Sequence, residues 1–240
     1  MQRQGIMKLG LISAVFFTLV SSISFAAESK RPTVVELFTA QGCPSCPKAD
    51  TMLKEISAHP EYLPLSYHVT YFDNEGWKDP YSSVENNLRQ RRYLMAVGIK
   101  EAFTPHFVVD GTISSAGSDA KSFVQAIKES QNIALSFPLS ATYNPNTNGL
   151  DVVIGDDTHQ IPPDSVLYEV HFKKSVTTSI RGGGNDGITT ENVNNVLSFF
   201  KMPLSPRYFV PVSRLTGDGV AYLLHNNEGR IMGSAYYIKP

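Results

Sequence analysis

Strand-like and helix-like runs alternate along the first half of the chain. Three stretches that are apolar throughout, or apolar at every second position, predict strands: residues 33–39, 65–71 and 107–109. Three stretches with apolar residues three or four positions apart predict helices: residues 44–56, 81–97 and 119–127. Asp110-Gly111 directly follows the third strand and is typical of a hairpin turn. The alternation predicts a mixed α/β sheet between residues 31 and 131.

The second half, residues 134–240, has a different pattern. Short apolar runs are separated by turn-forming segments such as Asn144-Pro145-Asn146, and six of them predict strands: residues 139–143, 150–154, 166–172, 208–212, 220–224 and 231–238. Residues 191–200 predict a helix that follows the glycine-rich stretch 181–187. The pattern predicts a second domain that is antiparallel, β-rich and sandwich-like.

The N-terminus has the three parts of an export signal. Arg3 and Lys8 precede an apolar run at residues 9–20, and Ser24-Phe25-Ala26 supplies the small residues of a cleavage site. The run is shorter than the ~20 residues of a spanning helix, although an uncleaved anchor is the alternative. We therefore expect residues 1–26 to be removed near Ala26, giving a periplasmic or secreted protein with no remaining membrane segment.

Composition narrows the function classes. The 240 residues contain 21 Lys and Arg against 22 Asp and Glu, so the basic surplus of a nucleic-acid-binding protein is absent. Hydrophobic residues make up 42% of the chain, which is too many for a disordered protein. Two cysteines in a chain of this length exclude a disulfide-stapled mini-fold.

Both cysteines lie in one motif, Cys43-Pro44-Ser45-Cys46, between a predicted strand and a predicted helix. Unpaired N–H groups and the dipole at a helix N-terminus favour a thiolate, so we expect an exposed, acidic Cys43 sulfur. Cys46, one turn later, would resolve the mixed disulfide that Cys43 forms. The sequence thus predicts a redox-active dithiol that exchanges with protein thiols or disulfides.

Two other interpretations of the pair remain open. A disulfide across so small a loop would add little stability, which makes a purely structural bridge a weaker explanation. A metal site would need ligands from elsewhere, and the six histidines show no paired spacing. We predict no resident metal, and the stretch 181–187 lacks the pattern of a phosphate or dinucleotide loop, so we predict no cofactor.

Thr104-Pro105 precedes the third predicted strand. Together with Glu36-Leu37-Phe38 and the CxxC motif it resembles the thioredoxin-like fold, which implies that Pro105 is cis and packs against the dithiol. The longer stretch 35–47, with Gly76-Trp77-Lys78-Asp79-Pro80 and residues 89–93, resembles the DUF1223 family of secreted bacterial proteins. That resemblance implies a thioredoxin-like half with an added β region, and it carries no assigned function.

Three further side chains are candidates for supporting roles. The resemblance to thioredoxins implies that Glu36, on the first strand, is a buried acid that accepts a proton from Cys46; the alternative is a solvent-facing strand residue. His106 would stabilise the thiolate as a cation, or be an ordinary core histidine. Trp77 would line an apolar groove for a partner, or pack in the core.

Three functions follow from these residues. The leading hypothesis is an extracytoplasmic thiol–disulfide oxidoreductase that uses Cys43 and Cys46, with Thr104 and Pro105 beside them. The second is a thioredoxin-like scaffold that binds a protein or a ligand. The third is the handling of a soft metal such as Cu(I) by the two cysteines with His106.

Overall fold

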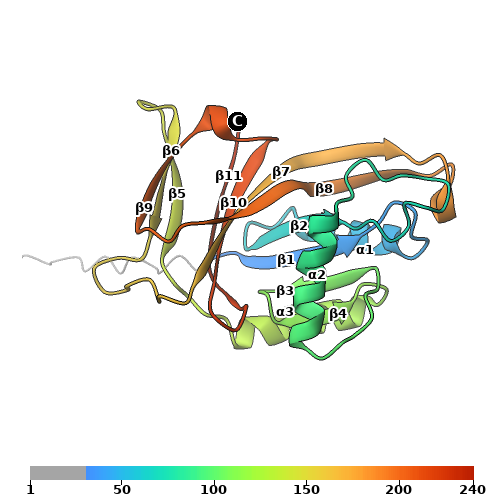
Figure 1. Ribbon diagram of the computed structural model, residues 1–240, viewed down its shortest axis with the longest axis horizontal. Coiled ribbons are helices and arrows are strands. Elements are labelled where there is room, and N and C mark those ends of the chain that lie inside the picture. Colours follow the sequence, from blue (N-terminus) through green and yellow to red (C-terminus); the bar gives the residue numbers. More distant parts are fainter. Residues whose placement is uncertain (1–30) are drawn as a thin grey trace, which may run out of the picture.

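The computed structural model describes residues 31–240 and shows an α/β fold with one large sheet (Figure 1). The predicted signal segment, residues 1–26, lies outside the described residues. The large sheet is mixed and has eight strands in the order β11-β10-β7-β8-β2-β1-β3-β4. Its strands are β1 Thr33–Thr39, β2 Tyr62–His68, β3 His106–Val109, β4 Ile113–Ala116, β7 Val166–Ser179, β8 Thr189–Met202, β10 Gly219–His225 and β11 Ile231–Ile238.

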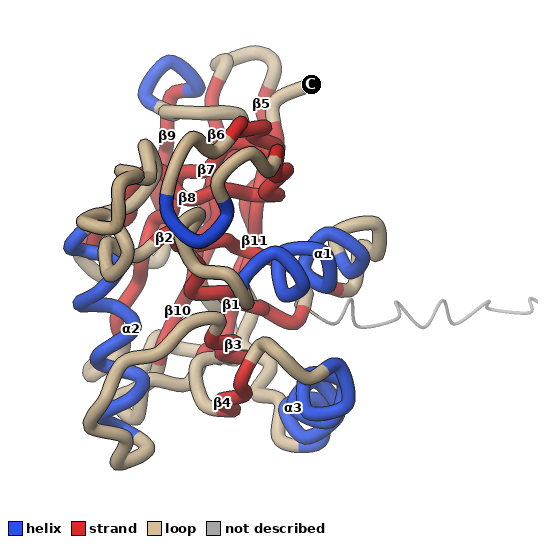
Figure 2. The backbone as a smooth tube through the Cα atoms, turned by 90° about the vertical axis from the view of Figure 1, so that its right-hand side faces the viewer, coloured by secondary structure: helices blue, strands red, loops and turns tan. Residues whose placement is uncertain are grey.

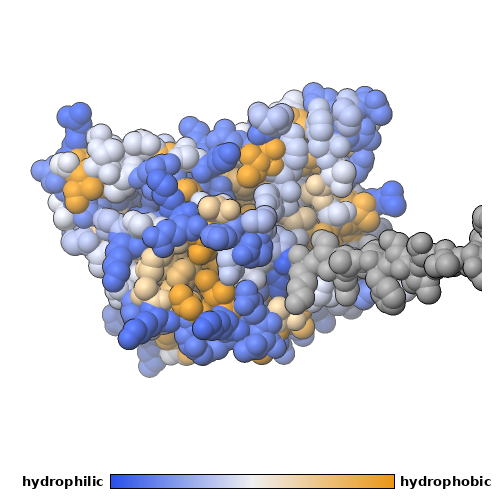
Figure 3. All heavy atoms as spheres, turned by 180° about the vertical axis from the view of Figure 1, so that it is seen from behind, coloured by the Kyte–Doolittle hydropathy of each residue, from blue (hydrophilic) through white to orange (hydrophobic). Residues whose placement is uncertain are grey.

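Three helices cover the two faces of this sheet near β1 (Figure 2). They are α1 Cys46–Ile56, α2 Val84–Ala96 and α3 Ala120–Asn132. Apolar side chains of α1 and α3 pack on the face that carries Val35 and Leu37, while Phe38 points to the opposite face with Tyr93 of α2. On its outer side the α1–α3 layer carries an apolar hollow, visible in the rear view (Figure 3), lined by Met52, Ile56, Phe123 and Val124.

Strands of both halves of the chain belong to the one large sheet. β1 and β2 run parallel, and β2 also pairs in parallel with β8 at a single position, Ser66 with Asn195. The proposed division at residues 131–134 therefore separates two sequence halves whose strands are hydrogen-bonded to each other. Dividing the chain into two domains at this point stays a prediction.

A smaller antiparallel sheet completes the second half. Its order is β5-β6-β9, with β5 at Leu139–Asn144, β6 at Gly149–Ile154 and β9 at Arg207–Pro211. Leu150 and Val152 of β6 pack with Tyr222 and Leu224 of β10 in a separate apolar core. This sheet lies at the end of the molecule opposite the tip of the β7–β8 hairpin (Figure 1).

The helix predicted at residues 191–200 is wrong, because these residues form most of β8. β8 pairs with β7 along nearly its whole length, from Thr189 opposite Ser179 to Met202 opposite Leu167. The local apolar spacing is compatible with a helix, but the long antiparallel ladder decides the structure. The register of this ladder shifts between His171 and Phe172, close to the place where β8 meets β2.

Arg31 connects the beginning of the described chain to its last strand. Its guanidinium donates to the carbonyl oxygens of Leu135 and Ile231 at 2.7 and 2.8 Å, and to Asp110 at 2.7 Å. Asp110 in turn accepts from the backbone N–H of Val34 at 3.0 Å and from Ser130 at 2.7 Å. One buried carboxylate thus joins β1, the β3–β4 turn, α3 and the start of the chain.

Candidate dithiol site

Cys43 lies in the loop between β1 and α1, ahead of the helix rather than in its first turn. The helix begins at Cys46, two residues later than predicted, with Ser45 at the N-cap position. A turn connects the two cysteines, since the Cys46 N–H donates to the Cys43 carbonyl oxygen at 3.2 Å. Both cysteines are free thiols.

The pKa of Cys43 is lowered from its usual value to about 5. The largest cause is a hydrogen bond from the Cys46 thiol to the Cys43 thiolate; burial opposes it, and Ser45 and Thr104 add smaller favourable contributions. The Ser45 hydroxyl lies 3.3 Å from the Cys43 sulfur. The pKa of Cys43 is thus lowered, as predicted, and the hydrogen-bond donors around the sulfur account for that direction.

Burial raises the pKa of Cys46, and the hydrogen bond it gives to Cys43 adds to the effect. The Cys46 side chain is fully buried at the start of α1. The two thiols therefore differ: Cys43 ionises readily, whereas Cys46 holds its proton. This difference in pKa is the one expected between an attacking thiol and a resolving thiol.

Asp50 was not among the sequence-predicted site residues, and it lies one helical turn after Cys46. Its carboxyl group is buried, and its Oδ1 atom has no hydrogen-bond partner among the described residues. Burial raises the pKa of Asp50 to about 6, with the His68 cation opposing that shift and Cys43 adding to it. A buried acid with this pKa can exchange a proton with its surroundings near neutral pH.

His68 and Asp79 form a buried ion pair behind the dithiol loop. His68 Nδ1 lies 2.6 Å from Asp79 Oδ2, and both side chains are almost inaccessible. Burial alone would lower the pKa of His68, but Asp79, with smaller contributions from Asp50 and Asp73, raises it. Asp79 Oδ2 also accepts from the backbone N–H of Gln41 at 3.0 Å, which fixes the approach to Cys43.

The Thr104-Pro105 segment lies beside the dithiol, as expected. The peptide bond between these residues is cis. The Cys43 sulfur lies 3.9 Å from the Thr104 carbonyl oxygen. A side chain on Gly117 would fall within 3.1 Å of both Pro105 and Ala49 of α1, so these three residues pack tightly together.

Glu36 does not serve the dithiol in the way the sequence suggested. It is buried, but its Oε1 accepts from Arg89 Nε at 2.6 Å and its Oε2 accepts from the Tyr93 hydroxyl. Arg89 in turn lies over the rings of Tyr67, Tyr93, Tyr168 and Phe199. The carboxylate is engaged in a structural ion pair, and the buried acid beside Cys46 is Asp50.

His106 is an uncharged core histidine. It is fully buried, and its two ring nitrogens lie 3.2 Å from Gln90 Nε2 and 2.6 Å from the Ser114 hydroxyl. Burial lowers the pKa of His106 to about 4. A neutral imidazole cannot stabilise the Cys43 thiolate as a cation, so that expectation is wrong.

Trp77 contacts the dithiol loop directly. Its indole N–H donates to the side-chain oxygen of Gln41 at 3.0 Å, and its Cβ lies close to Gly182. Phe72 packs on the other side of the loop, where a side chain on Gly42 would come within 2.9 Å of it. Trp77 thus holds the dithiol loop in place.

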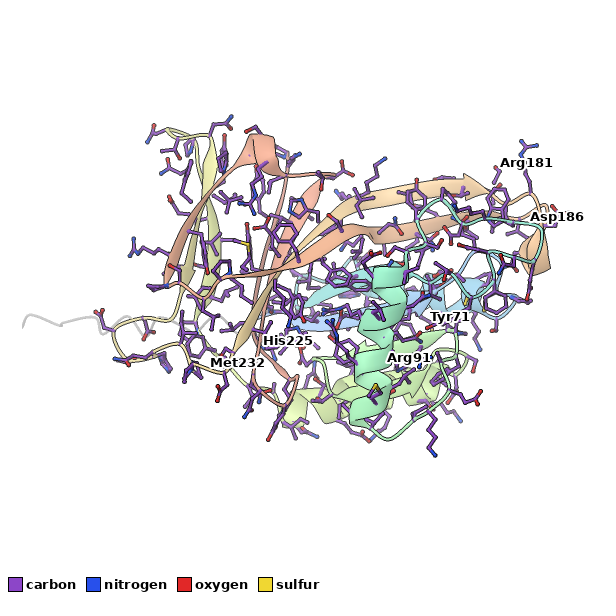
Figure 4. The ribbon with its side chains drawn as sticks, in the orientation of Figure 1. Tyr71, Arg91, Arg181, Asp186, His225 and Met232 are labelled. Atoms are coloured by element: carbon purple, nitrogen blue, oxygen red, sulfur yellow. The ribbon has the colours of Figure 1, made fainter. Side chains whose placement is uncertain are left out.

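The tip of the β7–β8 hairpin, residues 181–187, covers the dithiol loop. The Asn185 carboxamide donates to the carbonyl oxygens of Gln41 and Cys43 at 2.8 and 2.7 Å, and the Gly184 N–H donates to Gly42 at 3.2 Å. Arg181 and Asp186 mark this tip in Figure 4. Cys43 is only 1% exposed, so the prediction of an open sulfur is wrong for this conformation.

Comparison with protein families decides the family of the chain. Residues 34–208 match the model of a family described as protein of unknown function, DUF1223. The chain belongs to the DUF1223 family. The resemblance inferred from the stretch 35–47 is therefore confirmed. Comparison with curated proteins gives no match.

Two solved structures resemble this DUF1223 protein. Protein AGR_C_4864 from Agrobacterium tumefaciens is 24% identical, has a TM-score of 0.74, and aligns over 89% of this chain and 97% of its own. HBP35 of Porphyromonas gingivalis is 14% identical, has a TM-score of 0.51, and aligns over 88% of this chain and 76% of its own. At these identities the likeness establishes a shared fold.

Two other features of the DUF1223 chain bear on the alternative functions. Within residues 31–240, no group of three or more His, Cys, Asp or Glu side chains is arranged to hold a metal ion. A cavity of about 390 Å³ lies between α2 and the β10–β11 turn, lined by Arg89, Arg92, Tyr168 and His225.

Within residues 31–240, no helix has the length and apolar character needed to cross a membrane.

Proposed function

We propose that this protein is an extracytoplasmic thiol–disulfide oxidoreductase whose N-terminal half is a thioredoxin-like domain. The observation that carries the proposal is the contrast between two adjacent free thiols: the pKa of Cys43 falls to about 5, whereas that of Cys46 rises. Such a contrast favours one sulfur as nucleophile and leaving group, and the other as resolving thiol. The predicted export signal would place the protein where disulfides persist.

In the proposed exchange, the Cys43–Cys46 disulfide breaks and a disulfide forms in the partner. Starting from the oxidised protein, a partner thiolate attacks Cys43 of the Cys43–Cys46 disulfide, and Cys46 leaves and takes up a proton. A second partner thiolate then attacks the partner sulfur of the mixed disulfide, and Cys43 leaves as a thiolate. The partner dithiol is oxidised by two electrons, and the cysteine pair of this protein is reduced. The reverse sequence reduces a partner disulfide.

Asp50 is the group that supplies the proton to Cys46 and accepts it on the return. It lies one turn along the same helix, and its raised pKa, about 6, allows both protonation states near neutral pH. The His68 cation limits the rise of the Asp50 pKa, whereas the negative charge of its partner Asp79 adds to that rise. The proton of Cys46 thus has a buried acceptor that does not require bulk water.

The low pKa of Cys43 favours oxidation of partner thiols. A stabilised thiolate stabilises the reduced form of the protein, and a less basic thiol leaves a mixed disulfide faster. Both effects push electrons from the partner to this protein. We therefore propose partner dithiols in exported polypeptides as the substrate class, with reoxidation by another disulfide.

The test is a redox titration followed by single-turnover exchange. The oxidised protein is mixed with a dithiol peptide, and disulfide transfer is followed by mass. Cys43→Ser abolishes transfer, and Thr51→Val, an exposed position on the same helix, has no effect. In the reverse direction, reduced Cys46→Ser is mixed with the disulfide form of the peptide; Cys43 attacks that disulfide, and the mixed disulfide accumulates because no Cys46 thiol resolves it. Absence of exchange by the wild-type protein in every redox buffer contradicts the proposal.

The burial of Cys43 and the 390 Å³ cavity favour a second candidate, a binding module on the same scaffold. The cavity lies beside α2 and is not lined by either cysteine. In that case, replacing both cysteines leaves ligand binding intact. A ligand screen with the Cys43→Ser/Cys46→Ser variant beside the wild type separates the two candidates, because loss of binding in the variant excludes this one.

A further inference from the structure

The backbone of the dithiol loop is contacted by a segment far away in the sequence, the tip of the β7–β8 hairpin. Asn185, 142 residues after Cys43, is itself buried at 3% exposure and uses one amide nitrogen for two backbone carbonyls of the dithiol loop. Neither carbonyl belongs to a helix or strand, and a buried carbonyl needs a donor. Asn185 therefore both closes the loop and completes its hydrogen bonding.

The contact between the tip and the loop depends on the absence of side chains. A Cβ on Gly184 would lie 2.4 Å from the Pro44 ring and 2.9 Å from the Gly42 carbonyl oxygen. Gly183 similarly lies against Gly42, and Gly182 against the carbonyl of Gly76. The tip is thus fitted closely to the loop that carries Cys43.

The tip is attached to the dithiol loop through a small number of hydrogen bonds. Below it, Ile180 and Ile188 close the hairpin with a backbone hydrogen bond, and Glu191 of β8 pairs with Lys54 of α1. Three of its residues, Gly182, Gly183 and Gly187, have positive φ angles. Besides its packing, the seven-residue tip is held on the dithiol loop mainly by the hydrogen bonds of Asn185 and Gly184.

We propose that residues 181–187 form a gate over Cys43 and that Asn185 is the positioning residue that holds it shut. The proposal deepens the proposed function, on which its substrate class rests. When the gate lifts, the Gln41 carbonyl oxygen loses its Asn185 donor, and the Cys43 carbonyl oxygen keeps only the Cys46 N–H. Both oxygens can then accept from the backbone N–H groups of an extended polypeptide. The substrate class is thus an extended segment that carries a cysteine, and a thiol on a compact folded surface reacts more slowly.

The test measures how fast Cys43 is alkylated in the reduced protein by a small reagent, iodoacetamide, and by a bulky one, a polyethylene-glycol maleimide. Modified Cys43 is located by peptide mass. Two variants open the gate in different ways: Asn185→Ala removes the two hydrogen bonds, and Gly184→Ala inserts a methyl group against Pro44. Asn146→Ala, on the exposed β5–β6 turn, is the matched control.

We expect both gate variants to react with the bulky reagent about tenfold faster or more, and the iodoacetamide rate to rise less. The pH midpoint of alkylation should be the same as in the wild type. The gate changes access to the sulfur, whereas the pKa of Cys43 is determined by Cys46 and Ser45. The control should match the wild type. If Asn185→Ala fails to fold, Gly184→Ala decides.

Unchanged bulky-reagent rates in the folded variants overturn the gate. A shift of the pH midpoint that accounts for the faster rates also overturns it, because Asn185 would then act on the thiolate. Alkylation needs no redox partner, so its outcome is distinct from that of the exchange assay. Gated alkylation without any disulfide exchange would retain the gate and remove the oxidoreductase proposal.

The substrate class has its own measurement. Oxidised protein is offered an unstructured dithiol peptide and the same dithiol within a folded domain. The wild type should oxidise the peptide at least about tenfold faster, and Asn185→Ala should narrow the difference. Equal rates for the two substrates in the wild type contradict the assignment.

Discussion

Asp50 and Cys46 lie one turn apart on α1, and both side chains are buried beneath the dithiol loop. The Asp50 charge contributes to the raised pKa of Cys46, and the nearby Cys43 thiolate contributes to the raised pKa of Asp50. One negative charge in the site is therefore stable, whereas a second negative charge on a neighbouring group is destabilised by repulsion. The predictions on thiol chemistry follow from this coupling.

Replacing Asp50 with Asn should slow the step in which Cys46 attacks the mixed disulfide. The carboxylate that accepts the Cys46 proton is lost, and a general base is typically worth roughly 100-fold. The rate is measured by stopped-flow release of the partner thiol as a function of pH. The wild-type profile should show an inflection near pH 6 that Asp50→Asn lacks. Glu55→Gln, on the exposed side of the same helix, is the control; an inflection that persists in Asp50→Asn would exclude the role.

The same substitution should stabilise the reduced protein above pH 6. Because the pKa of Asp50 is raised from 3.8 to about 6 in the fold, its stabilising contribution is complete below pH 3.8 and is lost as the pH rises through 6. The change corresponds to roughly 2–3 kcal/mol. Urea unfolding of both proteins at pH 4 and pH 8 should show the advantage of Asp50→Asn only at the higher pH. A constant difference would contradict the shift.

Cys46→Ala should raise the pKa of Cys43, and Ser45→Ala should raise it by less. The Cys46 thiol is the strongest donor to the Cys43 thiolate and Ser45 is a weaker one, so removing either destabilises the charged form. The measurement is thiolate absorbance in the ultraviolet during a pH titration. Thr51→Val should leave the midpoint at about 5, and a Cys46→Ala midpoint that stays there would show that another group sets the acidity.

Asp79→Asn should destabilise the fold by about 3 kcal/mol, because it leaves a buried His68 without its counter-charge. The raised pKa of His68 means that its contribution is complete below its unfolded value near 6.5 and is lost as the pH rises through the folded value. The lowered pKa of Asp79 means that its contribution holds above 3.8. The decrease in the free energy of unfolding, measured with denaturant, should thus be largest between about pH 3.8 and pH 6.5. Asp157→Asn, on an exposed loop, is the control.

Glu36→Gln should destabilise the protein without changing the pH profile of Cys43 alkylation. The carboxylate neutralises Arg89 inside an aromatic cluster, and breaking a buried ion pair costs about 3–5 kcal/mol. Glu36→Gln/Arg89→Met removes both charges and should recover much of that loss. A shifted alkylation profile in the single variant would restore Glu36 to the dithiol site.

Local sequence signals were sufficient for the parts of the site that depend on neighbouring residues. The apolar run 33–39 is β1, Asp110-Gly111 forms the β3–β4 turn, and Asp119 caps α3 with its side chain. The Thr104–Pro105 bond is cis, as the resemblance implied. In each case the determining contacts lie within a few residues, or the motif itself carries the information.

The rest depends on contacts that sequence spacing does not contain. Residues 191–200 have an apolar spacing that suits a helix, but their pairing partner, β7, lies on the other side of a hairpin. Asp50 does give a signal, because it is a lone acid on the apolar face of a helix one turn after a cysteine. The resemblance to thioredoxins, however, places the buried acid at Glu36 on the strand. The contact between the hairpin tip and the dithiol loop has no local signal, since Asn185 is 142 positions away from Cys43.

The hydrogen bond from the Arg31 guanidinium to the Ile231 carbonyl oxygen joins residues 200 positions apart. A chain in which the first described residue holds the last strand cannot complete its fold until nearly all of it has been synthesised. If the predicted leader directs export, a chain still emerging from the ribosome would lack β11 and would remain open, the state in which a polypeptide is threaded across a membrane. The closing strand would then be added only on the far side, where the two sulfurs would meet their first oxidant.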